Sequence, residues 1–141
     1  MMKVRYAKPE DYGQILIIDE GIDFRDFQRW TDNKQVMFIY ENEDFCGWLQ
    51  FGFLFEKIPF INRFYIMEEF RGLGNGTLTL LIWERQMMER MYDTFMLSTA
   101  VTNTKAQEFY EKHGYQKVGQ LTLPDHEHEE EIFYYKHKPL F

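Results

Sequence analysis

Three glycines within five residues mark the segment of this sequence that is best suited to chemistry. The segment reads Arg71-Gly72-Leu73-Gly74-Asn75-Gly76, after a strand-like stretch and before a helical pattern. Glycine permits tight turns that direct consecutive N–H groups into one concavity. A helix beginning there adds the positive end of its dipole. The segment therefore predicts a site for a phosphate or pyrophosphate, with a purely structural turn as the alternative.

Two common nucleotide-binding patterns do not fit this segment. No Gly-Lys-Ser/Thr follows it, which excludes the Walker pattern. The spacing Gly-Leu-Gly-Asn-Gly also differs from the dinucleotide fingerprint, and no early β-α-β frame precedes it. The anion site is thus expected to be of another kind.

A second motif follows about thirty residues later: Asn103-x-x-Ala106-x-x-x-Tyr110-x-Lys112-x-Gly114-Tyr115. Its spacing predicts a helix over 104–113, with Ala106, Phe109, Tyr110 and His113 on one face. Thr104 and Gln107 suggest a capping box at its start, and Gly114 suggests its end. Taken alone, Tyr110 is interpreted as a core aromatic residue of an amphipathic helix.

The elements that must position these motifs alternate in type. Hydrophobic periodicity predicts strands over 3–7, 35–41, 45–55, 59–67, 95–99, 115–123 and 132–137. It predicts helices after Pro9 and over 23–30, 76–91 and 104–113. The order is therefore β-α-α-β-β-β-α-β-α-β-β.

This order predicts an α/β (α+β) fold within one domain, residues 1–141. Three consecutive strands favour antiparallel pairing, and a helix between the fourth and fifth strands favours a parallel crossover. We expect a mixed, mostly antiparallel sheet of about six to seven strands with helices on both faces. In the long third strand, Gly47 and Gly52 mark a bulge or a close approach. Trp30 and Trp48 are interpreted as core or as the wall of a cleft.

With both motifs in this order, the chain resembles the GNAT superfamily, the GCN5-related N-acetyltransferases. Arg-x-x-Gly-x-Gly is similar to the acyl-CoA pyrophosphate signature of that family, and the second motif is similar to its later helix. The element order agrees over essentially the whole chain. The resemblance implies that acetyl-CoA is the acyl donor, without a metal, and that a primary amine is the acceptor.

The resemblance also implies a role for individual residues. The backbone of the loop would hold the pyrophosphate, and the preceding strand end would pair with the pantetheine arm as an extra strand. Asn103 would bind the arm from the other side, and Tyr110 would protonate the departing thiolate. The implied cofactor-binding residues are Tyr65, Ile66, Met67, Arg71, Gly72, Leu73, Gly74, Asn75, Gly76, Asn103 and Tyr110.

The chemistry is compatible with the role of Tyr110. An amine attacks the thioester carbonyl directly, and an N–H near Ile66 would stabilise the developing oxyanion. A thiol titrates near pH 8.5 and a tyrosine near pH 10. Proton transfer from phenol to thiolate therefore costs about 2 kcal/mol at ordinary pKa values, which is small beside a chemical barrier.

Two departures from the family pattern concern the base and the loop. Many members carry a glutamate early in the fourth strand, where this chain has Phe60, and many carry lysine in the loop, where it has Leu73. The first departure leaves the general base open among Glu68, Glu69, Asp19, Glu20 and water. The second indicates a loop that binds anions through backbone dipoles more than through charge.

Composition excludes several classes of protein. The chain has 141 residues, 45% of them hydrophobic, and a net charge of −7, so binding to nucleic acid or an anionic membrane is not expected. One cysteine, Cys46, excludes an internal disulfide framework and is interpreted as a small buried thiol. No signal peptide or membrane span is expected, which favours the cytoplasm. His126 and His128 lie among acids and are interpreted as a solvated loop rather than a metal site.

The charges are unevenly distributed. Residues 9–44 hold ten acidic and three basic residues, and residues 45–119 hold eight of each. In the family it resembles, the first helices and the last hairpin border the acceptor site. This distribution favours a cationic acceptor, with a solvated acidic surface as the alternative.

Other questions stay open from the sequence. The acceptor can be a small molecule or a protein amine, and the resemblance allows a homodimer. An acyl-CoA-binding module of the same fold without catalysis is the alternative function. A third hypothesis is an interaction domain without a cofactor, in which the glycines serve only to form turns.

Overall fold

The structure, a computed structural model, describes residues 1–124 and 130–141. Its contacts group the chain into two compact units. The first unit comprises Met1–Gly52 and Asn62–Glu84, and the second comprises Phe53–Ile61 and Arg85–Phe141. His126 and His128, and with them most of the acidic loop, lie outside the described residues.

The element order agrees with the expectation from the sequence, and seven strands pair in the order β1-β2-β3-β4-β5-β7-β6. The β4–β5 pair is parallel, with Phe60 opposite Met96. The β1–β2, β2–β3, β5–β7 and β6–β7 pairs are antiparallel. The predicted mixed, mostly antiparallel sheet is therefore confirmed. The strands are β1 Met2–Tyr6, β2 Val36–Glu41, β3 Asp44–Leu54, β4 Ile58–Ile66, β5 Thr94–Ala100, β6 Gln116–Thr122 and β7 Glu130–His137. The helices are η1 Pro9–Asp11, α1 Tyr12–Ile18, α2 Phe24–Asp32, η2 Glu68–Phe70, α3 Asn75–Glu89 and α4 Thr104–Lys112.

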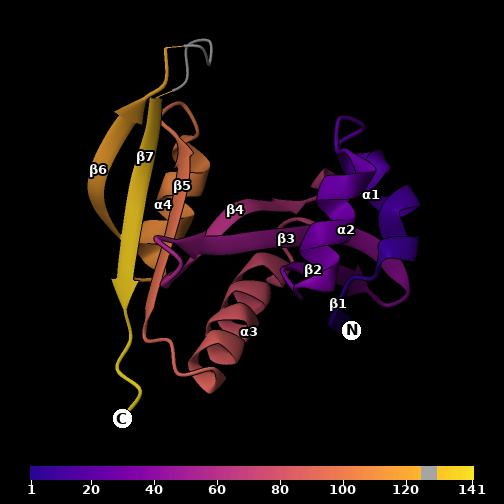
Figure 1. The fold of residues 1–141 in the computed structure, drawn as a ribbon, viewed down its shortest axis with the longest axis horizontal. Helices are drawn as coiled ribbons and strands as arrows, with labels where there is room; N and C mark the ends of the chain where they lie inside the picture. The colour runs from indigo at the N-terminus through magenta and orange to yellow at the C-terminus, as the bar shows by residue number, and fades with distance from the viewer. Residues whose placement is uncertain (125–129) are drawn as a thin grey trace. The chain divides into compact units, whose positions relative to one another are not determined.

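The first unit packs helices on both faces of its strands. On one face, α1 and α2 lie against β2 and β3 (Figure 1), and Trp30 of α2 lies 6.3 Å from Trp48 of β3 between ring centres. On the other face, Phe51 of β3 packs against Trp83 of α3, with 5.7 Å between the ring centres. Residues 48 and 51 differ by an odd number, so strand alternation places them on opposite faces. Burial of these large aromatic side chains is the main stabilising contribution.

Local chemistry explains how the elements of this unit begin and turn. The side chain of Asp23 accepts a hydrogen bond from the Arg25 N–H and caps α2. The β2–β3 hairpin turns at Asn42 and Glu43, where Asn42 has a φ of 58°, a conformation that asparagine tolerates. The antiparallel pairing expected for these consecutive strands is confirmed.

In the second unit, β7 pairs with both β5 and β6, and α4 lies beside these strands (Figure 1). Tyr110 of α4 lies 5.9 Å from Tyr115 and 6.3 Å from Tyr134 between ring centres. Gly114 has a φ of +91°, as expected for a glycine that ends a helix.

The predicted capping box of Thr104 and Gln107 is wrong. Asn103 caps α4 instead, since its Oδ1 accepts the Ala106 N–H at 3.1 Å. Gln107 donates to the carbonyls of Ala100 and Val101, which joins the helix to the end of β5. Asn103 rather than Thr104 is the capping residue because the capping position must have non-helical backbone angles, and residue 103 has them.

Candidate active site

The glycine-rich loop adopts the conformation for which its composition is suited. Gly72 and Gly74 have φ values of +78° and +83°, and a Cβ at either position would meet nothing within 4 Å. Glycine is therefore required here for backbone conformation and not for space. The chain then enters α3 at Asn75, and the Leu78 N–H donates to the Gly74 carbonyl at 3.1 Å.

The N–H groups of residues 72–77 donate to no described residue of the chain. Those of residues 75–77 belong to the first turn of α3, where helical geometry leaves donors without internal partners. Gly72, Leu73 and Gly74 are exposed. The loop therefore offers a series of accessible donors at the positive end of a helix of 15 residues, an arrangement that binds anions.

Buried polar contacts hold the start of the helix in place. The Asn75 side chain is 3% exposed, and its Nδ2 donates to the Phe70 carbonyl at 3.2 Å. The Thr79 hydroxyl donates to the Asn75 carbonyl at 2.7 Å. The side chain of Leu73 is 61% exposed and supplies no charge. Asn75 thus shapes the loop from inside, and the donors that face solvent belong to the backbone.

Arg71 is fixed beside the same loop. Its Nε donates to the Ile66 carbonyl at 2.6 Å, and its Cζ lies 5.1 Å from the centre of the Tyr65 ring. Its terminal nitrogens have no hydrogen-bond partner among residues 1–124 and 130–141. The guanidinium is therefore held in place through Nε, and its terminal nitrogens can donate to a phosphate.

At the end of β4, one edge of the strand faces β3 and the other faces away from it. On the β3 side, the Met67 N–H donates to the Cys46 carbonyl at 2.7 Å. The Tyr65 carbonyl also faces that side, because a Cβ at Gly47 would lie only 2.2 Å from it. The close approach expected at Gly47 is confirmed. Successive peptide groups of a strand point in opposite directions, so the N–H of Ile66 points away from β3.

Tyr110 and Asn103 belong to the second unit. Tyr110 is 7% exposed, and burial raises the pKa of its phenol above the ordinary value, so that it stays protonated at neutral pH. Asn103 is exposed, and its Oδ1 is used for capping. His113 packs on Phe109, and its Nδ1 lies 2.7 Å from the Phe109 carbonyl, which is a structural contact at the end of the helix.

The carboxylates considered as bases are all exposed: Glu68 and Glu69 in η2, and Asp19 and Glu20 after α1. Asp19 accepts the Gly21 N–H at 2.9 Å. Phe60, at the family's glutamate position, is 9% exposed and packs on Phe133 with ring centres 5.8 Å apart. Position 60 therefore serves packing in this chain.

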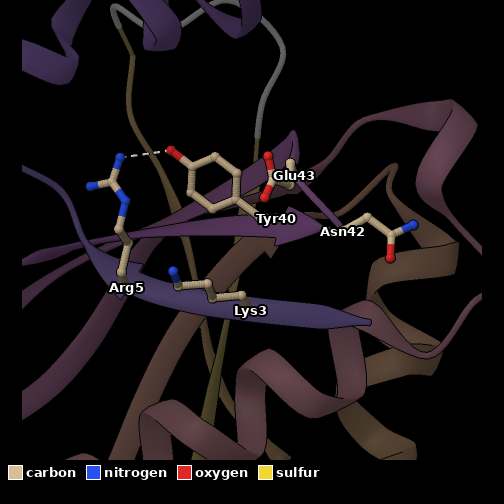
Figure 2. A pocket seen from close by; sticks show the side chains of 5 residues that line it. All are labelled: Lys3, Arg5, Tyr40, Asn42 and Glu43. Carbon is tan, nitrogen blue, oxygen red and sulfur yellow. Dashed lines mark hydrogen bonds between the residues drawn. The ribbon is translucent and has the colours of Figure 1, made fainter.

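A pocket of about 320 Å³ lies on the first unit, and the sequence reasoning did not identify it. Figure 2 shows its lining by Lys3, Arg5, Tyr40, Asn42 and Glu43. Arg5 donates to the Tyr40 hydroxyl at 2.7 Å and to both carboxylate oxygens of Asp11. This ion pair raises the pKa of Arg5 and lowers that of Asp11, so the arginine is already neutralised. Only the β1–β2 register brings Lys3 opposite Tyr40.

Cys46 was the remaining side chain that could act as a nucleophile. Cys46 is buried, as expected, and burial raises the pKa of its thiol to about 11. Within the described residues, no three His, Cys, Asp or Glu side chains gather as a metal site would require. In the same part of the chain, no helix is long and apolar enough to cross a membrane.

Comparisons with known proteins agree with this geometry. A model of the acetyltransferase (GNAT) family matches residues 6–115. A search of curated protein sequences found no match. An acetyltransferase of the GNAT family from Bacillus cereus has a similar structure, with a TM-score of 0.79, 21% identity and coverage of 99% of both chains.

Two further solved structures are similar and contain ligands. PaiA N-acetyltransferase from Thermoplasma acidophilum, in complex with coenzyme A, has a TM-score of 0.82 at 14% identity, covering 97% of this chain and 99% of that one. Naa50 from Arabidopsis thaliana, in complex with the bisubstrate analogue CoA-Ac-MVNAL, has a TM-score of 0.77 at 15% identity, covering 96% and 97%. At these identities the likeness shows the fold alone.

Proposed function

Because the chain belongs to the GNAT acetyltransferase family, we propose that it transfers an acetyl group from acetyl-CoA to a primary amine. The observation that carries the proposal is the loop at residues 71–76, where the N–H groups from Gly72 onward donate to no described residue as the chain enters α3. These donors, with Arg71, would hold the pyrophosphate. The coenzyme A bound to a protein of similar fold supports this choice of donor molecule.

The end of β4 would bind the pantetheine arm and the thioester. Tyr65, Ile66 and Met67 would pair with the arm as if it were an added strand, and Asn103 would bind it through its side-chain amide nitrogen. The Ile66 N–H, which points away from β3, would donate to the oxyanion formed when the amine attacks the carbonyl. The geometry of Gly47 supports this orientation.

Tyr110 would act as the general acid. The amine nitrogen forms a bond to the acetyl carbon, the carbon–sulfur bond breaks, and the thiolate takes the phenolic proton. The proton released from the amine then restores the phenol through solvent. Burial makes Tyr110 a weaker acid, but a thiolate in dry surroundings is also destabilised, so both partners of the transfer shift in the same direction.

The base for the amine is proposed to be water, assisted by exposed carboxylates. No glutamate occupies position 60, and the remaining candidates Glu68, Glu69, Asp19 and Glu20 are exposed. An ammonium group that titrates near pH 10.4 loses its proton at a cost of about 4–5 kcal/mol at pH 7. We therefore expect the rate to rise with pH up to the pKa of the acceptor.

Replacing Tyr110 with phenylalanine tests the mechanism. The variant removes one hydroxyl and should lower kcat/KM by about 100-fold or more, while the Kd for acetyl-CoA stays unchanged. Tyr134→Phe is the matched control, since it removes a buried tyrosine hydroxyl that donates to Glu111 at 2.8 Å. The control should lose about 1 kcal/mol of stability and keep its kcat/KM within about threefold.

The alternative function is binding of acyl-CoA without catalysis, which the absence of a glutamate at position 60 favours. The two functions differ in one measurement, the release of coenzyme A in the presence of a broad set of amines. Tight binding of acetyl-CoA by calorimetry without any amine-dependent release would refute the enzyme and leave the binding module. Failure to bind either coenzyme A or acetyl-CoA would refute both.

A further inference from the structure

Arg63 of β4 is held in place by uncharged neighbours. Its Nη1 donates to Oε1 of Gln50 at 2.9 Å, and its Cζ lies 5.0 Å from the centre of the Trp30 ring. Arg63 itself is exposed, and it makes no ion pair with residues 1–124 or 130–141. A guanidinium has five N–H donors, so most of them are available to a ligand.

The groups that hold Arg63 are themselves fixed in the core of the first unit. Gln50 is 1% exposed, and its Nε2 donates to the Phe51 carbonyl at 3.1 Å, which turns its oxygen toward Arg63. Trp30 rests on Trp48, which is 2% exposed. A cation held by a buried amide and a half-buried indole has lost conformational freedom before a ligand arrives, which favours tight and specific binding.

Two other arginines of this unit have carboxylate partners. Arg5 binds both oxygens of Asp11 at 2.8 and 3.0 Å, and Arg29 binds Asp26 at 3.0 Å. The whole chain has 23 acidic and 16 basic residues, so carboxylates are abundant. The pairing of Arg63 with a buried amide and an indole therefore leaves its charge for a group outside the chain.

The position of Arg63 along β4 indicates which molecule it meets. It precedes Ile66 by three residues, or about 10 Å along a strand, on the side opposite to the loop at residues 71–76. In the proposed reaction the thioester lies at Ile66 and the phosphates at the loop. Arg63 thus lies beyond the reacting carbonyl, where the acceptor would be bound.

We infer that the acceptor carries a carboxylate close to its amine, and that Arg63 binds this carboxylate. This inference rests on the proposed function. A planar guanidinium with two adjacent donors matches a carboxylate in a bidentate pair. An acceptor of the α-amino acid type carries both an ammonium and a carboxylate in solution, so it is a zwitterion without net charge and replaces the cationic acceptor expected from the charge distribution.

The test compares acceptors with and without the carboxylate, and kcat/KM is expressed per unprotonated amine because the carboxylate raises the pKa of the neighbouring ammonium. The common α-amino acids and their primary amides are offered with acetyl-CoA to the wild type, Arg63→Gln and Arg63→Lys. We expect the wild type to prefer the best amino acid over its amide by about 10- to 100-fold in kcat/KM. Arg63→Gln should abolish this preference mainly through KM and lower the activity on the amide far less than the activity on the amino acid, and Arg63→Lys should retain part of the preference.

Arg29→Gln is the matched control, because Arg29 is an exposed arginine of the same unit that already has a carboxylate partner. It should keep the full preference. A preference of the wild type below about twofold would overturn the inference, as would an equal loss of activity on both acceptors in Arg63→Gln.

A binding measurement separates this inference from the proposed function. The same amino acids are titrated into protein saturated with coenzyme A, and tryptophan fluorescence is followed, with Trp30→Phe identifying the signal. Saturable binding that Arg63→Gln weakens about tenfold, without any acetylation, would support the carboxylate site and refute the enzyme. Acetylation of amides and amino acids alike would support the enzyme and overturn the carboxylate site.

Discussion

Replacing Gly47 with alanine should disable the proposed site without touching any residue that binds the substrate. Gly47 lies in β3, where the neighbouring strand comes unusually close. An ideal Cβ at this position would lie 2.2 Å from the Tyr65 carbonyl oxygen and 3.0 Å from the Ile66 Cα. Both contacts are with backbone atoms, which cannot rotate away as the end of a flexible side chain would.

The magnitude follows from these distances. A carbon and a carbonyl oxygen approach to about 3.3 Å, so the strand end must move by about 1 Å. Overpacking of this kind costs about 1–3 kcal/mol. The adjacent hydrogen bond from the Met67 N–H to the Cys46 carbonyl, now 2.7 Å, would stretch and lose about 1 kcal/mol more. The total loss of stability is therefore about 2–4 kcal/mol.

The effect on activity is expected to be larger than the effect on folding. The Ile66 N–H, which we propose as the oxyanion donor, would move with the strand end. A displacement of about 1 Å in a catalytic group can lower the rate about 100-fold. Denaturant unfolding gives the free energy of unfolding, and kcat/KM for acetyl-CoA at a temperature where the variant is folded gives the catalytic effect.

Gly52→Ala is the matched control in the same strand. Its Cβ would come no closer than 3.4 Å, to the side-chain nitrogen of Asn62, which is an ordinary contact. It should change stability by less than about 1 kcal/mol and leave kcat/KM within about threefold. A Gly47→Ala protein with wild-type stability would refute the packing argument. A destabilised variant with full kcat/KM would refute the role given to Ile66.

Three further variants or measurements test other parts of the molecule. Gly74→Ala forces an L-residue to a φ of +83° in open space, so it should lose about 1 kcal/mol of stability and raise the KM for acetyl-CoA about tenfold, whereas Gly13→Ala should do neither. Asp11→Asn removes the ion pair that lowers the pKa of Asp11. Its deficit of about 1 kcal/mol at pH 7, measured by denaturant unfolding, should shrink as the pH falls below about 4 and through the lowered pKa of Asp11, because the unfolded wild type takes up a proton before the folded carboxylate does; a deficit independent of pH would contradict the pairing. Cys46, with a pKa of about 11, is about one part in a thousand thiolate at pH 8, so a thiol reagent should modify it only on unfolding.

The sequence by itself determined the order of the elements and the position of the glycine-rich loop. Both depend on local properties. The loop at residues 71–76 needs glycines with positive φ, and a helix that follows it must leave its first N–H groups without internal partners. The periods of 2 and 3.6 residues in the hydrophobic pattern reflect the geometry of a strand or a helix, whatever packs against it.

The residue that caps α4 could not be predicted from the local sequence. Both Asn103 and Thr104 are residue types that cap helices, and the sequence pattern favoured the second because Gln107 follows three residues later. In the structure Asn103 caps the helix. The side chain of Gln107 is not available for a capping box, because its amide donates to the carbonyls of Ala100 and Val101 at the end of β5. The choice between adjacent capping residues depends on a neighbouring strand.

Only the tertiary structure decided which distant groups meet. Gly47 could be identified as a glycine that permits close approach, but its contact with the Tyr65 carbonyl depends on how two strands converge. Arg63, Gln50 and Trp30 come from two strands and a helix, and no spacing in the sequence joins them. Their juxtaposition results from long-range packing of the side chains around Trp48, and this packing determines which charges find partners and which stay available to a ligand.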